Sequence, residues 1–445
     1  MSARDTLSQL QSAQELDQRG SARWSVATRL LFRFCLVYFG LYCLSTQVLQ
    51  GLIPFSSLEV PDPATRWPVG AIVTWVAVHV FGVKTELVYF SGSGDKTFDW
   101  VYAFCLLIFS LLVIALWSLV DRKRQNYIAL DKWFRVFLRF CLAGQMFGYG
   151  LVKMVPLQMP FPPLTRLIEP FGHFSPMGVL WYSIGAAPAY EIFAGCAELL
   201  GGVLLVFPRT VTLGALICLA DLTQVFVLNM TYDVPVKLFS FHLVLICLVL
   251  LAPDFRRLGR FFFSTRSVEA SGRPPLFASA GRNRIALAVQ LAFGLLLVCG
   301  NAYGSWTAWH EYGGGKTKSP FYGIWEISEL TIDGQIKPPL LTDNERWRRA
   351  IFEVPSRMAF QRMDDSLARY ATGIDVQQGT LTFTKDTDKN WKAEFTFQRP
   401  SPTDLLLDGE MDQHQVHMRL ELLDAQKFLL LSRGFHWIQE YPFNR

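Results

Sequence analysis

The chain has 445 residues, of which 51% are hydrophobic and only 18% are charged, and its formal net charge is +5. A soluble domain carries about 25% charged residues, so this composition excludes an intrinsically disordered chain, a collagen and a small disulfide scaffold. It indicates a membrane protein, yet the mean hydropathy of +0.25 is low for a chain that is apolar throughout. The sequence must therefore combine an apolar part with a polar part.

The charges locate the boundary between these parts. Residues 1–318 hold 27 Lys and Arg against 18 Asp and Glu, a net charge of +9. Residues 319–445 hold 15 against 19, a net charge of −4, and contain none of the eight cysteines. We predict a cytoplasmic tail over 1–27, a transmembrane domain over 28–312, a glycine hinge over 313–318 and a β-domain over 319–445.

Seven stretches are candidate membrane spans, because a spanning helix needs about 20 mostly apolar residues. They cover residues 28–52, 99–120, 133–155, 186–207, 210–230, 235–253 and 284–305. A weaker stretch over 69–82 is too short to span, so we expect it to lie in the membrane interface or to re-enter. The predicted fold is a multi-pass α-helical membrane bundle followed by an antiparallel β-barrel.

The positions of Lys and Arg predict the orientation of the spans, because cytoplasmic loops carry an excess of both residues. If the N-terminus is cytoplasmic, the inner segments hold the clusters Arg122–Arg124 and Arg256–Arg266, and the outer segments hold few cations. Seven spans then place the C-terminal domain outside. The sequence predicts an integral protein of a bacterial-type inner membrane with an extracytoplasmic C-terminal domain.

Ionisable residues inside the spans are candidate functional residues, because a charge in hydrocarbon is costly. Glu191 and Glu198 are seven residues apart, which places them on one face of the fourth span. We predict that these groups form a polar cluster on the third to sixth spans, open to the outer side. The candidate catalytic residues are Lys153, Glu191, Glu198 and Asp221, and the candidate ligand-binding residues are Asn229, Tyr232, Asp233, Lys237 and His242.

A structural interpretation stands beside the functional one. Lys153 and Lys237 lie near helix ends, where they could reach the interface or pair with Glu191 and Asp233 to hold the bundle together. For any single residue the structural role is favoured, whereas for the whole cluster we favour a site. The six-proline segment over 155–176 cannot be one helix, and we expect a lid, a site wall or a structural cap.

The stretch RFCLAGQMFGYGLVKM over 139–154 resembles the Arg…Gly-x-x-Lys signature of the DoxX and HTTM superfamily, which includes the membrane domain of vitamin-K-dependent gamma-carboxylase. The stretch YEIFAGCAELLGGVLLVFPR over 190–209 resembles the DoxX pattern of a membrane glutamate followed by a Gly-rich helix. The resemblance implies a four-helix DoxX-like unit. It also implies that Lys153, at the position of the carboxylase base that deprotonates a reduced quinone, acts as a base or binds a quinone or lipid head. The carboxylase's long lumenal domain has no counterpart here, so the resemblance supports the fold better than the reaction.

Residues 319–445 alternate apolar and polar side chains in short runs, which predicts half-buried strands. We expect eight to ten antiparallel strands in a closed barrel, because closure removes exposed edges. Gly323 and Trp325 resemble the Gly-x-Trp of lipocalins, and Arg433 is predicted to pack over the tryptophan from a late strand. The resemblance implies either a barrel that holds one small hydrophobic ligand or a filled barrel that acts as an outer cap.

Two functions remain open from the sequence. The first is a DoxX-like membrane protein that binds a quinone or lipid in the polar cluster and serves as an oxidoreductase component. The second is a non-enzymatic, membrane-anchored lipocalin-like protein that binds a hydrophobic molecule or acts as a scaffold of the cell envelope.

His414 and His417 fall on opposite faces of a strand, so no metal site is expected. The basic residues follow membrane topology, so no nucleic-acid partner is expected.

Overall fold

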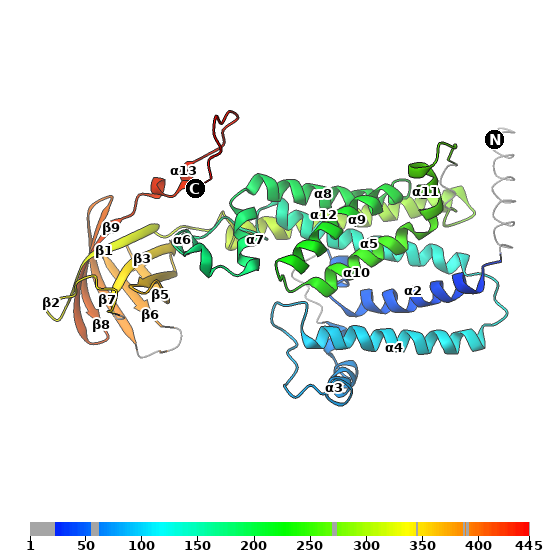
Figure 1. The fold of residues 1–445 in the computed structure, drawn as a ribbon, viewed down its shortest axis with the longest axis horizontal. Coiled ribbons are helices and arrows are strands. Elements are labelled where there is room, and N and C mark those ends of the chain that lie inside the picture. Colours follow the sequence, from blue (N-terminus) through cyan, green and yellow to red (C-terminus); the bar gives the residue numbers. More distant parts are fainter. Residues whose placement is uncertain are drawn as a thin grey trace. The chain divides into compact units, whose positions relative to one another are not determined.

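The computed structural model describes residues 23–54, 62–268, 274–343, 346–385, 388 and 391–444 (Figure 1). The chain folds into two compact units. The helical unit comprises the described residues within 1–158 and 189–307, and the barrel unit comprises those within 159–188 and 308–445.

Long helices build the helical unit. Its helices are α2 (Val26–Ser45), α3 (Val69–His79), α4 (Thr97–Val120), α5 (Ile128–Met154), α8 (Pro188–Val206), α9 (Val211–Thr231), α10 (Lys237–Leu251), α11 (Phe255–Phe263) and α12 (Ala280–Glu311). Local chemistry sets some of these bounds. The Ser25 hydroxyl accepts the Thr28 N–H at 3.1 Å and caps α2. Asp233 takes a left-handed φ of 54° directly after α9 and so reverses the chain into α10.

Among the described residues, six helical segments are long and apolar enough to cross a membrane: α2, α4, α8, α9, the segment Lys237–Phe263 that begins with α10, and α12. The protein is therefore an integral membrane protein. The remaining predicted span is α5, a helix of 27 residues that is long enough but carries several charges in its first half. The weak stretch forms α3, whose 11 residues are too few to span, as predicted.

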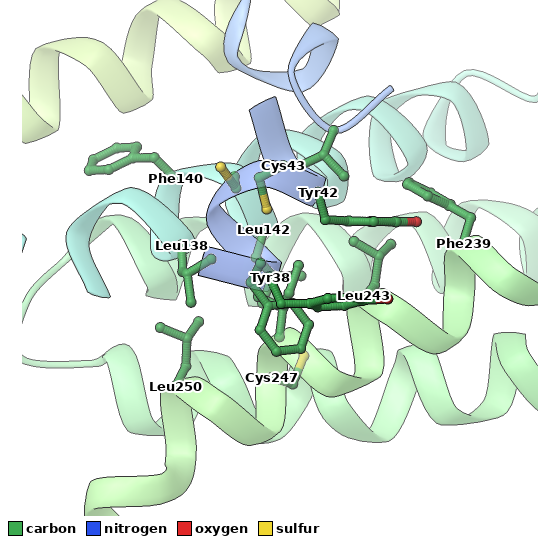
Figure 2. Packing of buried hydrophobic residues seen from close by; sticks show 14 of the residues in the cluster. Tyr38, Tyr42, Cys43, Leu138, Phe140, Leu142, Phe239, Leu243, Cys247 and Leu250 are labelled. Atoms are coloured by element: carbon green, nitrogen blue, oxygen red, sulfur yellow. The ribbon is translucent and has the colours of Figure 1, made fainter. Parts of the chain in front are cut away.

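Aromatic and aliphatic side chains of α2, α5 and α10 form the core of the helical unit. Figure 2 shows Tyr38 and Tyr42 of α2 facing Leu243 and Cys247 of α10, with Leu138 of α5 nearby. These side chains are almost fully buried. Because α5 contributes many buried residues, its charged groups must find partners within the protein.

Eight strands of the barrel unit close into an antiparallel barrel, which confirms the predicted fold. The strands are β1 (Gly323–Ile332), β2 (Gln335–Ile336), β3 (Trp347–Val354), β4 (Arg357–Arg362), β5 (Leu367–Asp375), β6 (Thr380–Thr384), β7 (Lys392–Ser401), β8 (Asp404–Met411) and β9 (His414–Leu422). Each strand from β3 onward pairs with the next, and β9 returns to β1 with Trp325 opposite Leu422. The two-residue β2 pairs antiparallel with the end of β1 and is not one of the eight strands that close the barrel.

Large side chains fill the interior of the barrel. Trp325, Phe352, Phe360 and Phe383 are completely buried, and the Trp347 ring stacks on Phe360 with centroids 3.6 Å apart. An eight-stranded barrel is just wide enough to be filled by its own side chains. The sequence allowed either a barrel that holds a ligand or a filled barrel, and this packing favours the filled barrel.

Most of the proline-rich segment, from residue 159 onward, belongs to the barrel unit. It forms the short helix α6 (Leu164–Leu167) and is followed by α7 (Pro176–Gly185). Leu164 and Ile168 pack against a small cluster on the barrel that contains Ile324 and Ile351. This segment therefore serves as a cover for one side of the barrel.

Candidate functional site

Two glycines bring α5 and α8 into backbone contact. A Cβ on Gly195 would lie 2.5 Å from the Gly150 oxygen and 2.7 Å from the Met154 nitrogen. A Cβ on Gly150 would lie 3.0 Å from both the Gly195 oxygen and the Leu199 nitrogen. No other residue fits at Gly195 without a shift, because real Cβ atoms essentially never approach other heavy atoms closer than 3.0 Å. The contact fixes the register of the two helices.

The same contact places an ion pair between the helices. Lys153 lies three residues after Gly150, and Glu198 lies three residues after Gly195, so each charged residue sits about one turn beyond its glycine. The Lys153 Nζ donates to the Glu198 Oε1, and the two side chains are only 9% and 3% exposed. The Tyr149 ring lies 5.8 Å from the ammonium nitrogen. The sequence prediction listed Glu191 as a partner of Lys153, whereas the structure gives it Glu198.

A third ionisable group completes the cluster. Asp221, near the middle of α9, is within electrostatic range of both Glu198 and Lys153. Among the described residues, no side chain or backbone group hydrogen-bonds to the buried Glu198 Oε2 or Asp221 Oδ2. Lys153, Glu198 and Asp221 therefore form one cluster of ionisable groups on α5, α8 and α9, which we call the carboxyl cluster.

The carboxyl cluster reaches the surface between α8 and α9. Asp221 is half-buried, whereas Glu198 is buried. One turn further along α9, the Gln224 amide donates to the Tyr190 hydroxyl of α8 at 3.4 Å, and both of these side chains are exposed. Glu191 is buried on α8 and is 1% exposed. Polar side chains therefore lie along the contact between α8 and α9, which are otherwise apolar, and we call this contact the seam.

Arg139, the first residue of the sequence signature, lies near the middle of α5 and binds the C-terminal end of α8. Its guanidinium donates to the carbonyl oxygens of Leu205 and Val206 at 2.9 Å, and to the Gln290 Oε1 of α12 at 3.1 Å. These carbonyls belong to the last turn of α8, where no intrahelical donor is available. Arg139 therefore caps the C-terminus of α8.

Asp233 and Lys237 lie in a second group, at the start of α10. The Lys237 ammonium is 2.8 Å from the Asp233 carboxylate and 3.8 Å from that of Asp95. Asp95 also accepts the Lys237 and Leu238 backbone N–H groups at 2.8 Å each, so it caps α10. Sequence reasoning missed Asp95 because it lies in the loop before α4, far from α10 in the chain. Nearby, the Asn229 amide donates to the Ser240 hydroxyl at 3.0 Å, and Tyr232 follows α9 directly.

His242 belongs to a third group, in the core between α2 and α10. Its Nδ1 is 2.7 Å from the Leu238 carbonyl oxygen, which can only accept, so Nδ1 carries the proton. The Tyr38 hydroxyl then donates to Nε2 at 2.8 Å. The Tyr42 ring stacks on the imidazole with centroids 4.0 Å apart. All polar atoms of His242 are satisfied, which gives it a structural role.

The barrel signature holds in part. Trp325 is fully buried in β1, and its indole N–H donates to the Phe321 carbonyl at 2.8 Å. The prediction for Arg433 is wrong, because Arg433 follows the short helix α13 (Leu429–Ser432), is half-buried, and lies 4.7 Å from the Phe443 ring. Instead, Arg399 of β7 lies over the Trp325 ring at 5.8 Å. Strand prediction from alternation could not distinguish the last strand from the tail beyond it.

A buried arginine was also missed in the barrel. Arg346 is 2% exposed and donates to the carbonyls of Lys337 and Ile327 at 2.9 and 3.1 Å, and to that of Trp347. Burial lowers the pKa of Arg346 from its ordinary value. The guanidinium therefore holds the β2–β3 connection against β1.

In the part of the chain that the structure describes, no group of three His, Cys, Asp or Glu side chains could hold a metal ion. His414 pairs with Asp333 at 2.6 Å, and His417 pairs with Asp408. The His414 side chain and the backbone N–H of Gln415 hold the pKa of Asp333 below its usual value. These pairs lie at the barrel surface, where they connect neighbouring strands.

The helical bundle and the closed barrel define the class of this protein as an integral membrane protein with a β-barrel domain. No family model matches the chain. No solved structure matches it significantly. Over 129 residues, which are 29% of the chain and 79% of the relative, it is 36% identical to the "Uncharacterized protein YwoB" of Bacillus subtilis (strain 168). The chain belongs to the same family as YwoB.

Proposed function

We propose that the helical unit binds a quinone or another lipid with a polar head at the carboxyl cluster, and that it serves as the membrane component of an oxidoreductase. The observation that carries this proposal is the buried Lys153–Glu198 pair with Asp221 beside it. An ionisable group within the membrane is costly and is therefore rarely retained without a function. Three such groups within electrostatic range of one another exceed what an anchor requires.

The chemistry of the cluster suits a ligand that gains or loses protons. If the Lys153 proton passes to Glu198, the ion pair becomes a free amine and a carboxylic acid. The amine can then accept the proton of a ligand hydroxyl. The Asp221 carboxyl, within electrostatic range of both groups, offers one further acceptor nearby. The resemblance of Lys153 to the carboxylase base agrees with this role.

The exposed seam between α8 and α9 suits lateral entry from the bilayer. Gln224 and Tyr190 present an amide and a hydroxyl at the lipid-facing surface, one turn from Asp221. A quinone or lipid head could exchange these hydrogen bonds for its own, while its tail stays among lipid chains.

The orientation is part of the proposal. We propose that α5 crosses the membrane as the seventh span, that the N-terminus is cytoplasmic and that the barrel is extracytoplasmic, because the Arg and Lys clusters then lie inside. Fusions of an alkaline phosphatase reporter after residue 125 and after residue 444 test this. Activity is expected only for the second fusion, and activity for the first would refute the orientation.

Mass spectrometry of quinones and lipids in protein purified in mild detergent tests the ligand. Wild-type protein is expected to retain a quinone or lipid that the Lys153→Ala and Glu198→Gln variants lose, together with any quinone-dependent activity. Lys237→Ala is the matched control, since it removes a lysine from a pair at the start of α10. Equal retention or full activity in both cluster variants would refute the proposal. An unchanged elution volume in size-exclusion chromatography separates loss of ligand from loss of fold.

A second candidate is a non-enzymatic scaffold, and the filled barrel favours it over a barrel that binds a ligand in its interior. The aromatic side chains of β1 and β3 to β6 occupy the space that a small hydrophobic molecule would need. In this case the barrel would contact envelope proteins through its outer surface. The readout is a protein that co-purifies with wild-type chain and is lost on removal of residues 319–445.

A further inference from the structure

The helix α11 follows α10 at the end of a continuous apolar segment, and its charge is arranged unlike that of the other helices. Its sequence is FRRLGRFFF. At 100° per residue, Arg256, Arg257 and Arg260 fall on one face, while Phe255, Leu258 and Phe262 fall on the opposite face. The helix is therefore amphipathic, and Phe261 and Phe263 lie between its basic and its apolar face.

The apolar face of α11 is mostly open. Leu258 packs against the core of the helical unit, but Phe255 and Phe262 of the same face are 48% and 61% exposed. Phe261 and Phe263, at the edges of this face, are 66% and 90% exposed. Three adjacent exposed phenylalanines would be unfavourable in water. They need an apolar surrounding at this end of α10.

The basic face divides into one structural arginine and two open ones. Arg257 pairs with the buried Asp254 at 3.2 Å. Arg256 and Arg260 are exposed. Two cations therefore remain available to an anionic surface.

The place of α11 in the fold points to the membrane surface. Residues 237–263 form one apolar helical segment long enough to cross a bilayer, so α11 lies where that segment leaves the hydrocarbon. Figure 1 shows α11 at the end of the helical unit where α2 begins and α4 ends. That end also carries the exposed Arg122 and Lys123 after α4.

We propose that α11 lies along the membrane interface and binds the headgroups of anionic phospholipids through Arg256 and Arg260, while its phenylalanines enter the boundary of the acyl chains. An amphipathic helix with arginines on one face and apolar side chains on the other binds such a surface in two ways. It buries its apolar side chains among the acyl chains, and its cations are attracted to the anionic headgroups. Juxtamembrane cations add affinity for anionic lipids. In the orientation proposed above, this surface is the cytoplasmic leaflet.

Native mass spectrometry of the full-length protein tests this, with phosphatidylglycerol and phosphatidylcholine titrated separately into the detergent. Wild-type protein is expected to retain phosphatidylglycerol in preference to phosphatidylcholine. The double variant Arg256→Gln/Arg260→Gln is expected to bind phosphatidylglycerol about thirtyfold more weakly, since two cationic contacts are lost. Arg256→Lys/Arg260→Lys should keep most of the affinity, which excludes misfolding as the cause.

The matched control is Arg122→Gln/Lys123→Gln, which removes the same charge from exposed positions at the same end of the bundle. It is expected to leave the phosphatidylglycerol affinity within about threefold of wild type, because that loop has no apolar face to hold it in the interface. Equal losses in the two Gln variants would overturn the assignment to α11. So would unchanged binding in Arg256→Gln/Arg260→Gln.

A second measurement uses the protein in nanodiscs. Amide hydrogens of residues 255–263 should exchange more slowly in nanodiscs that contain phosphatidylglycerol than in nanodiscs of phosphatidylcholine alone. The difference should disappear in Arg256→Gln/Arg260→Gln. Equal exchange in both lipids for the wild-type protein would refute the proposal.

Discussion

Replacing Gly195 by alanine tests whether the backbone contact of α5 and α8 holds the carboxyl cluster together. The new Cβ would lie 2.5 Å from the Gly150 oxygen, 2.7 Å from the Met154 nitrogen and 2.9 Å from the Lys153 Cβ. The first two are backbone atoms, which cannot turn aside as a flexible side chain can. The helices must therefore separate.

The expected cost follows from these contacts. Overpacking by a methyl group costs about 1–3 kcal/mol, and three contacts under 3.0 Å place this case near about 3 kcal/mol. Alanine is favoured over glycine within a helix by about 1 kcal/mol, which offsets part of the loss. We expect Gly195→Ala to lower the free energy of unfolding by about 2 kcal/mol.

Gly40 of α2 provides the matched control. A Cβ there meets nothing within 4 Å, so Gly40→Ala should gain about 0.5–1 kcal/mol from the helix propensity alone. The measurement is the free energy of unfolding from SDS titration in mixed micelles. If the two alanine variants were equally stable, the close approach of α5 and α8 would be refuted.

Three further predictions concern other parts of the chain. Lys153→Ala should lower the free energy of unfolding by about 3–5 kcal/mol in the same titration, because it leaves an uncompensated buried carboxylate. Lys237→Ala, at the partly exposed pair, should lower it by less than about 1 kcal/mol. Equal losses would contradict the burial of the Lys153–Glu198 pair. Burial raises the pKa of Asp62, which lies in the loop between α2 and α3, to about 6. The folded state then binds the proton more tightly than the unfolded state. The stability that this group contributes is therefore present below pH 3.8 and is lost as the pH rises to about 6. Asp62→Asn should remove this part of the pH dependence of stability, and an unchanged pH profile would contradict the prediction. Finally, Arg399→Ala should destabilise the barrel by about 0.5–1 kcal/mol through the lost contact with the tryptophan ring, whereas Arg433→Ala should leave the thermal unfolding midpoint unchanged.

The sequence by itself determined the division of the chain and the kind of element in each part. Long apolar runs interrupted by Arg and Lys clusters predict spanning helices, since only a helix satisfies its own backbone in a membrane. Alternation with period two predicts the strands, and barrel closure follows from the cost of exposed edges. These patterns are local, so they can be read without knowing which elements are neighbours.

The pairing of the polar groups could not be read in this way. Depth along the helices suggested one cluster of nine residues, but the structure separates the carboxyl cluster from the Asp233–Lys237 pair and from His242. Periodicity says which face of a helix a residue occupies, and says nothing of the rotation and register of the neighbouring helix. In this protein Gly150 and Gly195 set that register through a backbone contact.

Partners distant in the chain were decided by the tertiary structure alone. His242 meets Tyr38 across 204 positions, and Asp95 caps α10 across 142. Arg399 lies over the ring of Trp325 because it belongs to β7, a strand of the barrel. Arg433 does not, because the chain has left the sheet before residue 433. The sequence determines which side chains need a partner, because the cost of burial belongs to each group. Which partner each one receives depends on how the helices and strands pack.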